Sequence, residues 1–202
     1  MRYLFIAIVF LGACNHLQEH FKASSNASIP ARTVDTGDPS LIFKNGFWYF
    51  GSDLFSGIMQ EYFKGNTVKH RTAFLNGKEE GWQETFYEDG KLSEKRFYHN
   101  GEKDSVHTGW WPQGNKRFEY HFTNGVYNGD YKEWYETGEL MKHIHYTNGA
   151  DDWGKGWRQN GKLYMNFVVK DGRRYGLNNS NLCYTVKNGR GEFIASVEEP
   201  SK

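Results

Sequence analysis

Two interleaved series of glycines, each recurring about every 24 residues, constrain the fold of this chain more than any other feature. The first series closes an aromatic-X-Asn-Gly motif or a close variant, with spacings of 31, 24, 24, 24 and 23 between Gly46, Gly77, Gly101, Gly125, Gly149 and Gly172. The second series lies between these positions, with spacings of 25, 24, 24 and 23 between Gly65, Gly90, Gly114, Gly138 and Gly161. Such a period is typical of a repeat protein.

Two glycine turns in each period divide it into two strands of roughly eight residues or fewer. Asn-Gly favours the type I′ turns that join β-hairpins, because both central residues of that turn need positive φ. The composition agrees, since 17% of the residues are aromatic and 23 are glycine, and such residues suit strands and tight turns. We therefore predict an all-β fold: an elongated antiparallel β-meander of tandem β-hairpin repeats over residues 41–172, with about ten or eleven strands.

Aromatic residues recur at two neighbouring positions before the last four glycines of the second series, with Arg158 as the one exception. The first holds Phe86, Trp110, Trp134 and Trp157, and the second holds Tyr87, Trp111, Tyr135 and Arg158. Neighbouring residues of a strand face opposite sides, and equivalent residues of successive repeats lie about 9.6 Å apart at about 4.8 Å per strand. We expect most of these rings to pack the fold itself. The candidate binding surface comprises Trp110, Trp111, Trp134, Tyr135 and Trp157, with the W-W-P-Q-G segment departing most from the pattern.

Two segments carry a resemblance to a known family: G-W-Q-E-T-F-Y-E-D-G-K-L-S-E-K-R-F-Y-H-N-G (81–101) and G-D-Y-K-E-W-Y-E-T-G-E-L-M-K-H-I-H-Y-T-N-G (129–149). They resemble the variant MORN repeat, which is often found in bacterial proteins labelled YwqK-family antitoxins. The chain departs from that pattern in its longer first unit, at Ser105 in place of a glycine, and at Arg158 in an aromatic position. The resemblance implies a repeat β-sheet with a binding or scaffold role.

The first fourteen residues predict an address in the cell envelope. Arg2 precedes an apolar stretch that is shorter than the roughly 20 residues that a membrane span needs. Leu11-Gly12-Ala13-Cys14 resembles a bacterial lipobox. That resemblance implies a signal peptide over 1–13 and a lipoprotein acylated (for example with palmitate) at Cys14. Asn15, and not an aspartate, follows the cysteine, which favours the outer membrane, with the protein facing the periplasm or displayed at the surface. An ordinary signal peptide or an uncleaved anchor is the alternative. Residues 14–40 are polar and suit a flexible tether.

The end of the chain breaks the repeat register. Residues 173–202 begin with R-R-Y-G-L and finish in a polar tail, and terminal repeats often differ because they cap an open end. We predict a C-terminal cap here. Cys183 is the one cysteine besides Cys14, and a small packed residue is a simpler interpretation of it than a reactive thiol.

The sequence offers no catalytic set, so we expect a protein that is not an enzyme and that needs no cofactor. His121, His143 and His145 invite a metal hypothesis. Equivalent strand positions about 9.6 Å apart are too distant for one zinc ion, whose ligands lie within about 2.1 Å. Asp151, Asp152 and Asp171 lack the ordered spacing of a calcium loop. We predict no metal site.

The net charge of +1 gives no field that would attract nucleic acid. The leading hypothesis is an envelope lipoprotein whose repeat sheet is a binding or scaffold surface for a protein or an envelope polymer. Two alternatives stay open. One is an antitoxin-like or immunity partner of a toxin protein, and the other is direct binding of membrane lipid headgroups by the repeats. The oligomeric state stays open too.

Overall fold

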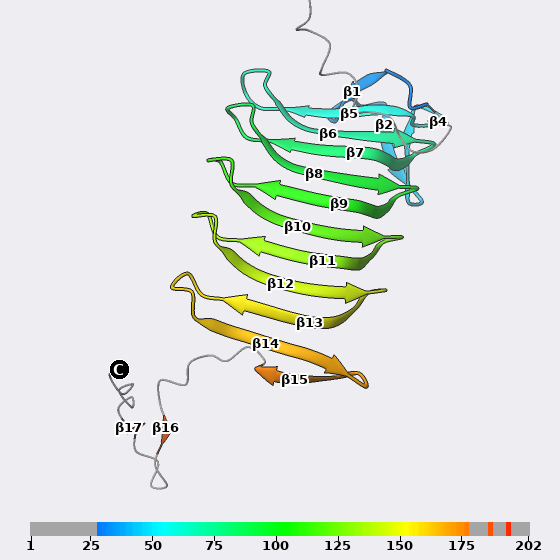
Figure 1. The fold of residues 1–202 in the computed structure, drawn as a ribbon. Coiled ribbons are helices and arrows are strands. Elements are labelled where there is room, and N and C mark those ends of the chain that lie inside the picture. Colours follow the sequence, from blue (N-terminus) through cyan, green and yellow to red (C-terminus); the bar gives the residue numbers. More distant parts are fainter. Residues whose placement is uncertain (1–27, 178–185, 188–192, 195–202) are drawn as a thin grey trace, which may run out of the picture.

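The computed structural model describes residues 28–177, 186–187 and 193–194. Within these ranges the chain forms strands and turns and no helix, so the predicted all-β class is confirmed. Eleven consecutive strands run as one antiparallel meander (Figure 1). They are β5 (Gly57–Tyr62), β6 (Val68–Leu75), β7 (Lys78–Phe86), β8 (Leu92–His99), β9 (Glu102–Trp110), β10 (Lys116–Thr123), β11 (Val126–Trp134), β12 (Leu140–Thr147), β13 (Ala150–Trp157), β14 (Leu163–Lys170) and β15 (Arg173–Leu177).

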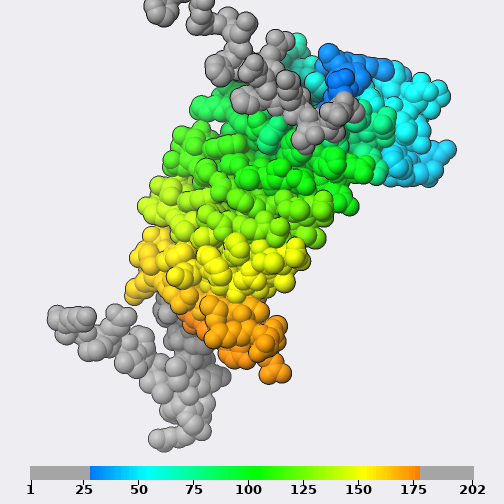
Figure 2. Space-filling view, turned by 45° about the vertical axis from the view of Figure 1, so that its right-hand side comes forward, coloured from blue at the N-terminus to red at the C-terminus, as the bar shows by residue number. Residues whose placement is uncertain are grey.

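Three further pieces complete the described chain. β1 (Thr33–Asp35) pairs in parallel with β5, which makes the main sheet twelve-stranded. A three-stranded sheet contains β2 (Leu41–Lys44), β3 (Phe47–Phe50) and β4 (Asp53–Leu54), and β16 (Val186–Lys187) pairs with β17 (Phe193–Ile194). Figure 2 shows the repeats as successive layers from the N-terminal to the C-terminal end of an elongated body.

The Asn-Gly turns have the backbone that the sequence predicts. Both central residues have positive φ, for example 53° at Asn100 and 84° at Gly101, as a type I′ turn requires. The second series contains one exception, because in its first copy the left-handed residue is Asn66, with φ of 62°, and not Gly65. Gly90 follows Asn66 by 24 positions, so the backbone keeps a regular period where the glycines do not.

A bulge lies four residues after the turn glycine in three hairpins. Gly81, Ser105 and Gly129 hold it with φ of 89°, 58° and 110°. Between the pairs Thr72↔Gln83 and Phe74↔Glu79 three residues of one strand face a single residue of the other, and the hairpins of Ser105 and Gly129 show the same shift. A left-handed backbone favours glycine, which explains why Ser105 is the unusual member of this position.

Two apolar clusters hold the ends of the main sheet. At the N-terminal end Val34, Phe55, Met59 and Phe74 are buried, and Leu41, Trp48 and Phe50 of the small sheet pack against them. Toward the C-terminal end Ile144, Met165 and Phe167 are buried, flanked by Tyr131, Tyr146, Tyr164 and Val169. The second cluster comes from strands of a single sheet, so neighbouring side chains of the repeats cover one another.

The predicted tether over 14–40 is wrong from Thr33 onward. Thr33, Val34 and Asp35 pair with Ile58, Met59 and Gln60 of β5. Val34 is the reason, because this apolar side chain is buried in the N-terminal cluster and its burial stabilises the pairing of an otherwise polar segment.

The predicted array over 41–172 is not one continuous sheet. Its first Asn-Gly turn joins β2 to β3, and these strands form the small sheet with β4. The first unit is longer than the others, and the additional residues contain β4 and a turn at Gly51, whose φ is 64°. The hairpin therefore folds out of the main sheet and packs against it.

The predicted cap over 173–202 begins too early. β15 pairs with β14 and continues the meander as far as Leu177. Gly176 lies four residues after the turn glycine Gly172 and has φ of 117°. The backbone pattern of the repeat therefore continues here, although the sequence no longer matches the repeat motif. Most of the remaining cap, including Cys183, lies outside the described residues.

Candidate binding groove

Aromatic residues close the turns at one edge of the sheet and also connect successive repeats. The backbone N–H of Trp111 donates to the carbonyl of Asn115, and the same bond recurs from Tyr87 and Tyr135. Their side chains reach the next repeat: the Tyr87 hydroxyl donates to the Trp110 carbonyl (2.7 Å), the Trp111 indole to the Trp134 carbonyl (3.2 Å), and the Tyr135 hydroxyl to the Trp157 carbonyl (2.9 Å). These rings therefore lie across the joints between repeats.

A groove of about 620 Å³ opens at this edge of the sheet, over β10, β11 and β12. Three of the five residues predicted for the binding surface line it, namely Trp111, Trp134 and Tyr135. Trp110 and Trp157 do not line it and instead contribute backbone carbonyls to the joints. The remaining lining residues, which sequence reasoning missed, are Arg117, Phe118, Tyr120, Glu133, Glu136, Met141 and Gln159.

A tyrosine and glutamate network borders the groove. The hydroxyls of Tyr120 and Tyr131 both donate to Oε1 of Glu133, and Lys142 contacts its Oε2 at 2.7 Å. Burial and the neighbouring carboxylate raise the pKa of both phenols. Burial alone raises the pKa of Glu133, but the hydrogen bonds from Lys142 and the two tyrosines outweigh it and lower that pKa. The carboxylate is thus held ionised and in a fixed position.

Most charged groups of the groove are already paired. Arg117 pairs with Glu94 of β8 and lies over the rings of Trp111 and Phe118. Lys116 lies 5.7 Å above the Trp134 ring and pairs with Glu119.

Three polar groups of the groove have unused hydrogen-bonding or ion-pairing capacity within the described residues. The exposed carboxylate of Glu136 accepts a hydrogen bond from the neutral amide of Gln113 at 2.5 Å. It has no cationic partner among the residues that the structure describes. In the same ranges the Trp134 indole N–H and the Gln159 amide donate to no protein group.

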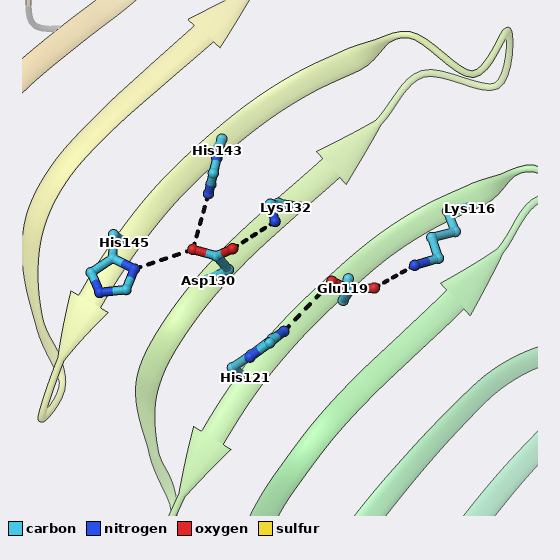
Figure 3. A network of polar contacts seen from close by, with 7 residues as sticks. All are labelled: Lys116, Glu119, His121, Asp130, Lys132, His143 and His145. Carbon is cyan, nitrogen blue, oxygen red and sulfur yellow. Dashed lines mark hydrogen bonds and ion pairs between the residues drawn. The ribbon is translucent and has the colours of Figure 1, made fainter.

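A second polar cluster lies on the opposite face of the sheet. Asp130 contacts Lys132 (2.5 Å), His143 (3.0 Å) and His145 (3.1 Å), as Figure 3 shows. Strand register places these residues on the face opposite to Tyr131 and Glu133. The ring of Trp153 packs against both histidines. Although burial raises the pKa of Asp130, the hydrogen bonds from Lys132, His143 and His145 lower it well below its usual range.

His121 does not join the other two histidines. It contacts Glu119 at 3.5 Å, and this pair lies beside the Asp130 cluster without a shared partner in Figure 3. Across the described residues no three side chains of His, Cys, Asp or Glu are arranged to hold a metal ion. The cluster acts as a cross-strand ion-pair network between β11 and β12.

A partial signal for the missed residues was present in the sequence. Arg117 and Met141 occupy the same position one repeat apart, as do Phe118 and Lys142. The groove thus lies where an aromatic ring and a thioether replace charged residues of neighbouring repeats, and a comparison of repeats position by position shows these replacements.

Comparison with known proteins gives this site no relative. No family model matches the chain, and no curated protein matches its sequence. Among the described residues no helix is both long and apolar enough to cross a membrane. Cys14, the predicted point of lipid attachment, lies outside those residues.

Proposed function

We propose that this protein is a lipid-anchored protein of the bacterial cell envelope whose repeat sheet binds another protein or an envelope polymer through the groove over β10–β12. The observation that carries the proposal is the concave aromatic lining at Trp111, Trp134 and Tyr135. Exposed aromatic surface in a concave site with a few polar groups is the usual character of a binding site. The anchor rests on the sequence around Cys14, and the scaffold role agrees with the variant MORN resemblance.

The structure around the groove suits binding by preorganised rings. Trp111 and Tyr135 are fixed by hydrogen bonds to the next repeat, so a ligand would find them already ordered. Side chains that are fixed before binding lose little conformational entropy when the ligand arrives. A repeat sheet also offers neighbouring units for further contacts with a long partner, which increases its avidity.

The test is capture of the partner by the full-length protein after cross-linking in intact envelopes. Met141→Arg introduces into the groove the residue that the preceding repeat already carries at this position, Arg117. Trp153→Phe alters the opposite face and serves as the matched control. We expect Met141→Arg to lose the captured protein or polymer and Trp153→Phe to retain it. Equal recovery by both variants would contradict the proposal.

A further inference from the structure

The aromatic residues at the groove edge recur at a distance that suits one particular kind of peptide. Trp111 and Tyr135, which line the groove, and Tyr87, which lies outside it, hold equivalent positions in consecutive repeats. Successive positions are two strands apart, so their spacing is about 9.6 Å at about 4.8 Å per strand. A polyproline II helix has three residues per turn and rises about 3.1 Å per residue, or about 9.3 Å per turn. A peptide in this conformation that crosses the strands presents an equivalent residue to each repeat.

The unsaturated donors of the groove suit the same backbone. A polyproline II helix has no internal hydrogen bonds, so its carbonyls remain available as acceptors. The indole N–H of Trp134 and the amide of Gln159 line the groove and donate to no described residue. Trp111 cannot take this role, because its indole N–H already donates to a backbone carbonyl. Two donors near neighbouring repeats can therefore each bind one peptide carbonyl.

The charge of the groove specifies the side chains of the ligand. Arg117 pairs with Glu94, which also pairs with Arg96, and Glu133 pairs with Lys142. The carboxylate of Glu136 at the groove mouth contacts only a neutral amide within the described chain. A carboxylate without a cationic partner among the described residues, close to the half-buried rings that line the groove, favours a cationic group, which gains the ion pair and contact with the ring edges.

We infer that the groove over β10–β12 binds an extended, proline-rich peptide segment that carries lysine or arginine. This inference rests on the proposed function and names the chemical class of its ligand. Aromatic grooves recognise polyproline II segments well, because the peptide is already ordered before it binds. A linear glycan also stacks on aromatic rings, but a neutral glycan would leave Glu136 uncompensated.

The experiment titrates the purified full-length protein with a synthetic peptide of Pro-Pro-Lys triplets, about 12 residues long so that it makes about four turns. Tryptophan fluorescence reports binding, since Trp111 and Trp134 line the groove. One control peptide has glycine in place of each proline, and another has glutamate in place of each lysine. We expect the glycine peptide to bind at least about tenfold more weakly because it is not preordered, and the glutamate peptide to bind weakest.

Four variants locate the site. Trp134→Phe removes the free N–H, and Glu136→Gln removes the free charge; each is expected to weaken binding by about threefold to tenfold. Trp110→Phe makes the first change at a side chain that does not line the groove, and Glu102→Gln makes the second at the opposite edge of the sheet, beside the Gly101 turn; both are expected to leave affinity unchanged. Equal binding of the proline and glycine peptides, or equal effects of groove and control variants, would overturn the inference.

The two proposals fail in different ways. If the Pro-Pro-Lys peptide does not bind but Met141→Arg still abolishes capture from envelopes, the groove is a binding site and the peptide class is wrong. Binding of a linear glycan fragment that Met141→Arg abolishes would replace the peptide with a polymer. If Met141→Arg changes neither capture nor peptide binding, both proposals are wrong.

Discussion

The N-terminal end of the main sheet and its strands β9–β13 bury their apolar side chains in different ways. At the N-terminal end a second sheet covers β1, β5 and β6, and the cluster around Phe55 and Phe74 is enclosed between layers. Along β9–β13 no second sheet packs on the repeats within the described chain. There the rings stack on one another, with centroid distances of 4.2 Å between Tyr120 and Tyr131 and 5.1 Å between Tyr127 and Tyr146.

The difference lies in the chemistry of the residues. The enclosed cluster consists of Val, Phe and Met, which need a dry environment. The uncovered stack is rich in tyrosine, whose ring packs while its hydroxyl reaches a polar partner such as Glu133. A sheet with no second layer is thus stabilised by side chains whose rings pack and whose polar hydroxyls can face water. The groove lies within this uncovered region.

The largest expected effect removes the enclosed cluster. Phe55 is 1% exposed, and Phe55→Ala should lower the free energy of unfolding by about 3 to 5 kcal/mol because it deletes a buried ring and leaves a cavity. Urea denaturation measures the change. Phe43→Ala is the control, since Phe43 is 60% exposed and should cost much less. Similar losses from both substitutions would mean that the N-terminal end is not a conventional core.

The uncovered region should respond to pH through His107. This side chain is 1% exposed between the rings of Tyr98 and Phe122, and its Nε2 donates to the Phe97 carbonyl at 2.8 Å. Burial lowers its pKa from 6.5 to about 4. Because the unfolded chain binds the proton first, stability is full above pH about 6.5 and falls by about 3 kcal/mol as the pH drops toward 4.

The measurement compares urea denaturation at several pH values between 7 and 4 for the wild type and His107→Gln. Carboxylates such as Asp130 also titrate in acid, but they are common to both proteins and cancel. The variant should lose less stability on acidification than the wild type. Parallel profiles would show that the folded repeats accept a proton on His107 without cost.

In the uncovered region an aromatic ring also packs directly on a glycine of the neighbouring strand. A Cβ added at Gly109 would lie 2.3 Å from the ring of Phe118 on the neighbouring strand. Gly109→Ala should therefore destabilise the protein by about 1 to 3 kcal/mol through overpacking. Gly65→Ala is the control, because nothing lies within 4 Å of its added Cβ. Thermal unfolding of the two variants should separate them clearly, and equal melting temperatures would refute the close packing.

The smallest expected effect concerns the bulge. Ser105 holds a left-handed φ of 58° where the preceding and following repeats have Gly81 and Gly129. Ser105→Gly should stabilise the protein by a few tenths to about 1 kcal/mol, since relief of backbone strain exceeds the entropic cost of glycine. The reciprocal Gly81→Ser should destabilise it by about 1 kcal/mol. Chemical denaturation of both variants checks the opposite signs; a shared sign would mean that the serine side chain dominates.

The periodic part of the fold was predictable from single residues. An Asn-Gly pair dictates its own turn, and the positive φ values at Asn100 and Gly101 follow from local sterics. The separation of β2–β4 from the main sheet was not predictable in this way. It depends on the packing of Trp48 and Phe50 against the cluster on the main sheet. Such a contact between distant segments is not a property of either segment alone.

The candidate site was predictable in part for the same reason. Trp111 and Tyr135, at the turns beside the groove, are conspicuous in the sequence because they recur with the period of the repeat. Trp110 and Trp157 recur as regularly, yet they do not line the groove. Periodicity identifies equivalent residues, but a groove forms where the side chains of successive repeats differ, as at Met141. Whether such a difference opens a groove depends on the side chains that surround it in the folded protein.

The side-chain hydrogen bonds between repeats all run in one direction, because Tyr87, Trp111 and Tyr135 each donate to the repeat that follows. Successive repeats are therefore related by a head-to-tail contact that does not close into a ring. A genetic duplication or deletion of one complete unit regenerates the same joint on both sides. The length of the sheet is therefore a heritable quantity that can change in steps of about 9.6 Å without the invention of a new contact. Each step would change the distance between the first and the last repeat by the same amount.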